Sequence, residues 1–390
     1  MIIARAAGER GVELVSTGYA HSEGLKKGVV VDLDEAAASI RRAAEEAELK
    51  SGVSVDWVTV GVSGDHVQSF NCHGAVSVEG KNHEVTQGDV QQVIHAAQTI
   101  PIPPDREIIH VLPQEFFLDN RGEITNPVGL TGSRLDVNVH VVTSEAALIQ
   151  NLVNAVNRSE MRVKKLVLQQ LASAEAVLTP DEKELGVAVV DIGGGTTDLA
   201  LLSRRSVRFT SVLPVGGEHF TRDLAIGLRT PLEEAERIKK EHGTVSSAGV
   251  AADESVEIPG VGTRPPRTLG RSVVSRILRD RAAEVLQLVR GEIDRSGCRA
   301  QLTSGAVFTG GGSLLDGLQE FAEEILEMPV RQGLPQGVGG LTADLAHPVY
   351  ATAVGLAMHG AQGDADGTRR RTQASSSSWS LNRLLGWVAN

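Results

Sequence analysis

Short apolar runs alternate with amphipathic segments along most of the chain. Runs of strand length predict buried β-strands at residues 29–33, 57–63, 163–168, 187–192 and 306–309. Apolar residues at helical spacing predict α-helices over residues 34–50, 86–99, 169–178, 231–242, 271–295 and 348–359. We also expect a helix that begins at Ser144. Because strands and helices alternate without a fixed repeat, the pattern favours an α/β architecture over a solenoid.

Two glycine-rich turns interrupt this pattern. The strand at residues 187–192 meets three glycines and resumes at residues 197–202, which predicts a β-hairpin. The strand at residues 306–309 is followed by three more glycines and a helix predicted over residues 313–326. Residues 245–267 are polar and rich in Gly and Pro, and they predict loops or short strands.

The last thirty-one residues, 360–390, differ in kind from the rest. Residues 360–378 have no apolar periodicity and predict a flexible linker. Residues 379–390, WSLNRLLGWVAN, have one apolar face at about 100° per residue. That face predicts a tethered amphipathic helix that anchors reversibly in a membrane surface, although such a helix also packs on its own protein in other cases. Its members are Leu381, Leu384, Leu385, Trp387 and Val388.

Composition narrows the classes of function. The 390 residues are enough for two to four lobes, and a net charge of −11 argues against nonspecific nucleic-acid binding. Only Cys72 and Cys298 are present, so no disulfide framework is expected and a reducing cytoplasm fits. We expect no signal peptide, because Arg5, Glu9 and Arg10 interrupt any apolar run near the start.

The segment DIGGGTTD, from Asp191 to Asp198, is the strongest chemical motif. Glycines without Cβ atoms let backbone N–H groups approach phosphate oxygens, and threonines add hydroxyl donors. A carboxylate such as Asp191 is suited to hold a Mg²⁺-bound water. The motif lacks the Gly-Lys-Ser/Thr of a Walker loop, and its glycines join two strands, unlike a Rossmann turn. A glycine hairpin without a ligand is the simpler alternative.

Two weaker motifs become informative about a nucleotide site only in combination with the first. TGGGS, at residues 309–313, predicts backbone amides at a helix start, where an anion or a ribose is favoured; a plain strand-to-helix turn is the alternative. In AERIK, at residues 235–239, Glu236 and Lys239 share a helix face, although a surface ion pair would have the same spacing.

Together the motifs resemble the actin/Hsp70/sugar-kinase superfamily, with DIGGGTTD as its second phosphate loop and TGGGS as its adenosine loop. Residues 169–178 and 351–360 resemble the helices between the two lobes of that fold. Within the superfamily the chain most resembles the FtsA family of bacterial cell-division actins. Residues 113–143 are similar to that family's inserted subdomain 1C, and the linker with a terminal Trp/Leu helix is similar to its membrane anchor.

The resemblance implies an α/β, actin-like fold of two lobes and four subdomains that binds ATP with Mg²⁺. The expected nucleotide contacts are Asp191, Gly193, Gly194, Gly195, Thr196, Thr197, Gly216, Gly217, Glu236, Lys239, Gly310, Gly311 and Gly312, with Asp191 also serving the metal. The expected divisions are 1A at 1–63, 144–171 and 350–362; 1C at 64–143; 2A at 172–221 and 306–349; 2B at 222–305; a linker at 363–378; and a membrane helix at 379–390.

The resemblance also implies a cell-division function. The protein would polymerise on the cytoplasmic face of the membrane at the septum, bind lipid through its last helix and recruit later division proteins through 1C. The tail of FtsZ would dock on 2B along residues 271–295, with Arg281 as a basic docking residue. Gln169 lies where actins carry a water-positioning residue, although it is more simply a helix-start glutamine, and we expect a structural ATP-binding protein rather than an enzyme.

Family members begin with a strand and a first phosphate loop of the form Asp-Ile-Gly-Thr, and this sequence starts after that loop. We therefore expect weak ATP binding by the chain as written. Two alternatives stay open at this point. A sugar or acetate kinase of the same superfamily would need a catalytic carboxylate beside a small-molecule pocket, and no motif for one is found. A pilus-assembly scaffold of the PilM kind shares the inserted subdomain but usually lacks the terminal anchor.

Overall fold

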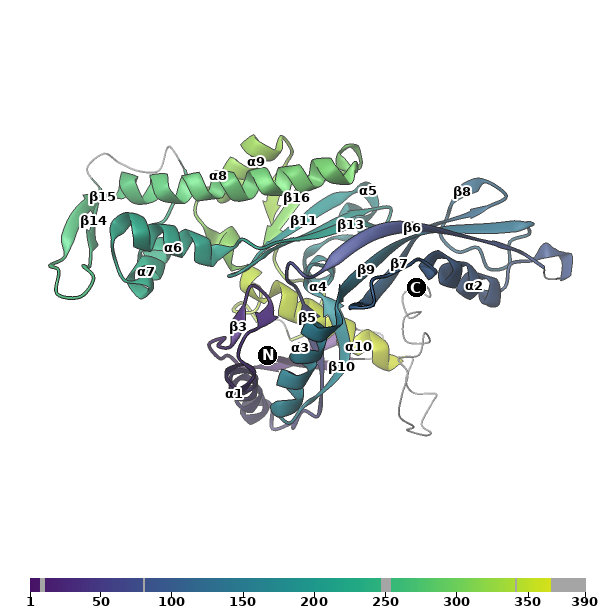
Figure 1. Ribbon diagram of the computed structural model, residues 1–390, viewed down its shortest axis with the longest axis horizontal. Coiled ribbons are helices and arrows are strands. Elements are labelled where there is room, and N and C mark those ends of the chain that lie inside the picture. The colour runs from purple at the N-terminus through teal and green to yellow at the C-terminus, as the bar shows by residue number, and fades with distance from the viewer. Residues whose placement is uncertain (8–10, 80, 247–253, 341, 366–390) are drawn as a thin grey trace.

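The computed structural model describes residues 1–390 except for 8–10, 80, 247–253, 341 and 366–390. Figure 1 shows two lobes that meet near the middle of the molecule. A sheet with one helix extends from them on one side, and a small hairpin with the ends of neighbouring helices extends on the other. The α/β fold class predicted from the alternating pattern is confirmed.

One lobe is built on a five-stranded sheet in the order β13–β12–β11–β16–β17. Strand β11 pairs antiparallel with β12 and parallel with β16, so that Asp191 lies opposite both Asp198 and Thr309. All residues of β11 and β12 are buried, as expected of continuous apolar runs. The strands are β11 (Val187–Ile192), β12 (Thr197–Ser203), β13 (Ser206–Leu213), β16 (Ala306–Thr309) and β17 (Val330–Gln332).

Helices cover one face of this sheet. Leu224 of α6, Leu278 of α8 and Phe321 of α9 share a core with Val190 and Leu199 of the sheet. These helices are α6 (Gly217–Leu228), α8 (Arg271–Ser296) and α9 (Leu318–Leu326), with α7 (Leu232–His242) packed beside α6. The polar stretch between α7 and α8 contains a small hairpin of β14 (Ser255–Ile258) and β15 (Arg267–Gly270).

The other lobe contains two small sheets and the helices around them. Strands β1 (Ile2–Ala6) and β2 (Val12–Thr17) are antiparallel, and β5 (Trp57–Val62) and β10 (Arg162–Leu168) are parallel. Helix α1 (Leu33–Ser51) packs against α3 (Ala146–Arg158), with Ala44, Val156 and Met161 in their core. A short hairpin, β3 (Leu25–Lys26) and β4 (Val29–Val30), precedes α1.

Two helices cross between the lobes. They are α4 (Gln169–Val177) and α10 (Ala351–Ala365), and α4 is followed by the short α5 (Pro180–Leu185). A Cβ atom on Gly355 would lie 1.8 Å from the Ala172 carbonyl oxygen, so only glycine permits this close crossing. Residues 169–178 and 351–360, which resemble interlobe helices in sequence, do lie against each other.

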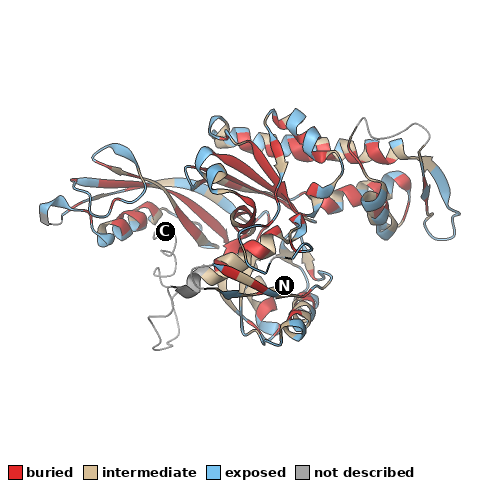
Figure 2. Cartoon of the chain, turned by 180° about the vertical axis from the view of Figure 1, so that it is seen from behind, coloured by how far each residue is buried: buried red, intermediate tan, exposed pale blue. Residues whose placement is uncertain are grey.

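The extension is a separate sheet with its own core. Its strand order is β6–β9–β7–β8, with α2 (Gln87–Gln98) packed against β6 and β9. Leu135, Val137, Val139 and Val141 alternate along β9 and are fully buried, whereas Figure 2 shows mostly exposed residues at the far end of the extension. The strands are β6 (Gln68–Ser77), β7 (Arg106–Leu118), β8 (Arg121–Ile124) and β9 (Arg134–Glu145).

Side-chain hydrogen bonds join this extension to the edge strand β13 of the five-stranded sheet. The Ser69 hydroxyl donates to the Thr210 carbonyl (2.8 Å), and His140 Nε2 lies 2.9 Å from Thr210 Oγ1. Gln114 Nε2 donates to the Val207 carbonyl at 2.8 Å. We call this contact between β13 and strands β6, β7 and β9 the seam.

Three helix predictions were wrong at their ends. Ser144 lies inside β9, so α3 begins two residues later at Ala146. The helix predicted from residue 313 is a 3₁₀ turn, Gly311–Leu314, followed by α9 from Leu318, because Gly317 adopts a φ of 75° between them. Helix α10 continues to Ala365, so residues 360–365 are helical and are not part of a linker. Thr86 does cap α2, through the predicted exchange with Asp89.

Candidate functional site

The turn between β11 and β12 is the centre of the candidate site. The Gly193 N–H donates to the Thr196 carbonyl at 2.9 Å, which closes the turn. Within the described residues, the N–H groups of Gly194 and Gly195 have no protein acceptor. Backbone donors left without partners in a glycine turn are the groups that bind phosphate oxygens in other nucleotide sites.

Gly216 and Gly217 form a wall behind this turn. The Gly217 N–H donates to the Gly193 carbonyl, and the Glu218 N–H donates to the Gly194 carbonyl, both at 2.8 Å. A Cβ on Gly216 would lie 2.7 Å from those two carbonyl oxygens. The Gly216 N–H itself donates to His219 Nδ1 at 3.1 Å. The amides of these two glycines, expected to contact a nucleotide, are therefore engaged with protein groups and hold the turn in shape.

The two threonine hydroxyls of the motif also donate to protein groups. Thr197 is fully buried and donates to the Val215 carbonyl at 2.8 Å. Thr196 donates to Asp198 Oδ2 at 3.0 Å, and Ser63 of the other lobe donates to Asp198 Oδ1 at 2.6 Å. Burial and the charge of Asp191 raise the pKa of Asp198 to about 7, and these hydroxyl donors lower it by less.

Asp191 is buried at the point where both interlobe helices meet the sheet. Its Oδ2 accepts from Ser173 of α4 (2.5 Å) and from Thr352 of α10 (2.8 Å). Burial raises the pKa of Asp191, and these two hydroxyl donors oppose that shift. Its Oδ1 accepts no hydrogen bond from the described residues, so one carboxylate oxygen is left for a further partner.

The predicted pair Glu236 and Lys239 lies against the glycine wall. The Lys239 ammonium lies 2.6 Å from Glu236 Oε2 and donates to the Gly217 carbonyl at 3.1 Å. The Thr221 hydroxyl donates to Glu236 and accepts from Lys239 at 2.8 Å. Burial raises the pKa of Glu236, but hydrogen bonds from Lys239 and Thr221 outweigh it and leave the pKa below its usual value. The pair is therefore part of the site rather than an isolated surface ion pair.

The second glycine motif lies beside the first turn, but it forms a 3₁₀ turn instead of the expected start of an α-helix. β16 pairs with β11 through Thr309 and Asp191, which places Gly310, Gly311 and Gly312 beside the first turn. The Ser313 hydroxyl donates to the Gly310 carbonyl at 2.7 Å, inside the 3₁₀ turn. Ser313 does not cap α9, so this loop offers a 3₁₀ turn rather than the N-terminus of an α-helix.

Two other predicted residues have different neighbours, and the predicted membrane face lies outside the described residues. Gln169 begins α4, and its Cγ would be 2.9 Å from a Cβ on Gly61 of β5. Arg281 of α8 makes a two-pronged ion pair with Asp223 of α6, at 2.5 and 3.1 Å. The apolar face of residues 379–390 falls outside the described residues.

Sequence reasoning missed several polar residues that complete the site. Ser63 donates to Asp198 from 135 positions away and Thr352 donates to Asp191 from 161 positions away, while Ser173 donates to Asp191 from 18 positions away. Lys27 belongs to this group because its backbone lies 3.2 Å from where a Cβ on Gly195 would be. The Ser-Gly pair that follows the predicted strand at 57–63 was the one signal available, since it places a small polar residue at a strand end.

Metal clusters and membrane spans were also sought in the described part of the chain. It contains no group of three or more His, Cys, Asp or Glu residues that could hold a metal ion. None of the helices described there has both the length and the hydropathy needed to span a bilayer.

Comparison with known proteins assigns the chain to a family. The model for cell division protein FtsA matches residues 188–355, and the model for the SHS2 domain inserted in FtsA matches residues 64–143. The FtsA of Pseudomonas aeruginosa is 42% identical over 383 residues, covering 97% of this chain and 91% of that protein. This chain belongs to the FtsA family. The FtsA of Escherichia coli K12 is 38% identical over 387 residues, with the same two coverages.

Solved structures agree with an actin-like fold. The PilM–PilN type IV pilus biogenesis complex superposes with a TM-score of 0.65 at 18% identity, covering 92% of this chain and 95% of that one. MreB 5 of Spiroplasma citri bound to AMPPNP gives a TM-score of 0.50 at 13% identity, covering 88% and 87%. At such identities the likeness shows the fold alone, so the pilus scaffold is a relative in architecture while FtsA is the family by sequence.

Proposed function

We propose that this FtsA family member is an ATP-binding, polymer-forming protein that attaches the FtsZ ring to the cytoplasmic face of the membrane. The observation that carries the proposal is a sequence match to FtsA proteins over 97% of the chain, joined to a glycine turn whose free amides lie where the two lobes meet. The rival small-molecule kinase has no supporting observation in either the site or the relatives.

ATP would bind against the turn between β11 and β12. The unpartnered amides of Gly194 and Gly195 would receive phosphate oxygens, and Lys239 would add positive charge beside them. The donor set fits a nucleotide with Mg²⁺, because Asp191 keeps one carboxylate oxygen without a hydrogen bond from the described residues, on the side of the Gly310 turn. Mg²⁺ would supply neutralisation of phosphate charge. Hydrolysis would be slow or absent, with Gln169 as the residue to examine for water positioning.

ATP would act on the polymer through the interlobe helices. Asp191 accepts hydrogen bonds from both α4 and α10. A nucleotide bound beside Asp191 would therefore influence the angle between the two lobes. A single amphipathic helix binds membranes only weakly, whereas many helices on one polymer bind by avidity. Polymerisation and membrane attachment would therefore reinforce each other. The extension at 64–143 would contact later division proteins, and the face of α8 would receive the FtsZ tail.

Liposome co-sedimentation, with and without ATP, tests these links in one experiment. We expect the wild-type chain to pellet with anionic vesicles, to pellet more with ATP, and to carry FtsZ with it. The Leu384→Glu, Trp387→Glu double variant should lose pelleting, because two charges enter its apolar face. The matched control is Asn382→Glu with Asn390→Glu, which adds the same charges to the polar face and should still pellet.

A third variant separates the nucleotide from the anchor. Gly194→Ala adds one methyl group whose nearest protein atom is 3.8 Å away, so we expect the fold to tolerate it. The methyl group would reduce the space through which a phosphate group approaches the backbone amides. This variant should pellet at the basal level without the increase on ATP. Full pelleting by the apolar-face variant would contradict the membrane anchor, and an undiminished ATP effect in Gly194→Ala would contradict the nucleotide site.

A further inference from the structure

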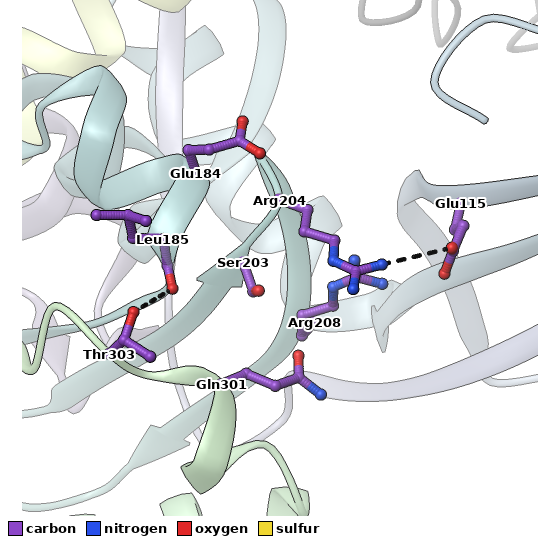
Figure 3. A pocket seen from close by; sticks show the side chains of 8 residues that line it. All are labelled: Glu115, Glu184, Leu185, Ser203, Arg204, Arg208, Gln301 and Thr303. Atoms are coloured by element: carbon purple, nitrogen blue, oxygen red, sulfur yellow. Dashed lines mark hydrogen bonds and ion pairs between the residues drawn. The ribbon is translucent and has the colours of Figure 1, made fainter. Parts of the chain in front are cut away.

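A pocket lies at the seam, away from the nucleotide site. Its volume is about 570 Å³, a size typical of small-molecule sites. Its walls come from the extension, from β12, β13 and the turn between them, and from the segments that precede β11 and β16. Figure 3 shows the eight residues that line it, and the side chains of Arg204 and Arg208 point toward Glu115 across it.

Arg208 is the unusual member of this pocket. Its Nε is buried, and in the described residues its guanidinium has no hydrogen-bond acceptor or ion-pair partner. Burial lowers the pKa of Arg208, Glu115 raises it, and the neighbouring charge of Arg204 lowers it. The side chain as a whole is partly exposed, but a buried Nε–H group without an acceptor is costly, because it loses water and gains no hydrogen bond in return.

The acidic residues of the pocket are already engaged elsewhere. Glu184 pairs with Arg205 at 2.9 Å. Glu115 Oε1 accepts the Glu123 N–H at 2.8 Å and lies 3.7 Å from Arg204. Arg204 itself has a closer partner in Glu123, at 2.9 Å. The one cation of the pocket that lacks a carboxylate partner is therefore Arg208.

Neutral donors stand beside that cation. The Ser203 hydroxyl and the Gln301 side-chain amide make no hydrogen bond with the rest of the described chain, whereas Thr303 already donates to the Leu185 carbonyl at 2.6 Å. A guanidinium with a hydroxyl and an amide is a donor set that matches the oxygens of a carboxylate or phosphate group.

We propose that this pocket binds a small soluble molecule through a carboxylate or phosphate group held by Arg208, with Ser203 and Gln301 as further donors. The ligand would bridge the five-stranded sheet and the extension, because Glu115 and Arg208 belong to strands that meet at the seam. Binding would therefore hold the extension against β13. This site is separate from the proposed nucleotide site, and neither depends on the other.

The test titrates the full chain with inorganic phosphate in one arm and with citrate in the other, following heat by calorimetry. The two arms distinguish phosphate from carboxylate recognition. Arg208→Gln should weaken binding of the preferred anion about tenfold or more, as loss of a charged hydrogen bond does. The matched control is Arg237→Gln, the same substitution at an arginine of α7 that pairs with Glu234 and Glu241, none of which lines the pocket. It should bind as the wild type does.

Two further readouts keep the result unambiguous. The thermal midpoint of Arg208→Gln should equal or exceed that of the wild type, because a buried N–H group without an acceptor is removed. A lower midpoint would show that Arg208 has a structural partner and would overturn the proposal. Hydrogen exchange should slow at residues 106–118 and 206–213 when the anion binds. Absence of saturable binding in both arms, undiminished binding by Arg208→Gln, or protection confined to residues 193–195 would each overturn it.

Discussion

Asp198 is a carboxyl group that the fold holds in an environment fitted to its neutral form. It is buried, it lies near Asp191, and its pKa rises to about 7. The folded protein therefore keeps a proton on it between about pH 4 and pH 7, where the unfolded chain has released that proton. The contribution of Asp198 to the free energy of unfolding is greatest at low pH and is lost as the pH rises toward and through 7.

Asp198→Asn should remove that part of the pH dependence. We expect the variant to match the wild type near pH 5 and to exceed it at pH 8 by a few kcal/mol in unfolding free energy, because no charge has to be buried. Urea unfolding at both pH values measures this, with the exposed Asp56→Asn as a control. A wild type and variant that differ equally at both pH values would contradict the assignment.

At the scale of elements, local patterns were predictable and long-range contacts were not. The hairpin at Asp191–Asp198 and the cap of α2 by Thr86 depend on neighbouring residues, and the sequence predicted both. Ser63 reaches Asp198 across 135 positions, and Thr352 reaches Asp191 across 161, which no local pattern encodes. Ser144 has the chemistry of a helix cap, yet pairing with β7 keeps it in a strand. The division into two lobes was predicted from the family resemblance, because the periodicity of apolar residues does not define it.

The crossing of α4 and α10 makes an element-scale prediction. Gly355→Ala would place a methyl group 1.8 Å from the Ala172 carbonyl oxygen, so the helices must separate. We expect a loss of about 1–3 kcal/mol in unfolding free energy, as overpacking of a close contact produces. Gly291→Ala is the matched control, because Gly291 lies at an exposed position of α8 where an added Cβ would meet no atom within 4 Å. Helix propensity should make this change neutral or slightly stabilising. Equal stabilities in denaturant would contradict the tight crossing.

At the scale of the whole molecule, the docking role proposed for Arg281 must compete with an internal one. Its guanidinium is held by Asp223 in a bidentate pair and by Glu284 at 2.5 Å. A carboxylate on an FtsZ tail would have to displace these partners. If the α8 face binds such a tail as proposed, it would do so at the cost of an existing pair between α6 and α8.

The competition predicts opposite effects from the two partners. Asp223→Asn should tighten binding of an FtsZ tail peptide several-fold, because it releases Arg281, and Arg281→Gln should weaken it. Fluorescence anisotropy with a labelled peptide measures both, and Arg276→Gln, an exposed arginine of the same helix, is the control. Weaker peptide binding by both variants would contradict this competition, because it would mean that the Arg281–Asp223 pair maintains the packing of α6 against α8 on which binding depends.

The two hydroxyl groups that donate to Asp191 come from segments that are synthesised at different times. One comes from α4, which precedes β11, and the other comes from α10, near the end of the described chain. A nascent chain that has released only the first 340 residues from the ribosome already contains the glycine turn, yet Asp191 still lacks its second donor. The site is therefore completed only after residue 352 has left the ribosome, and a chain truncated before Thr352 would carry the motif without a finished site.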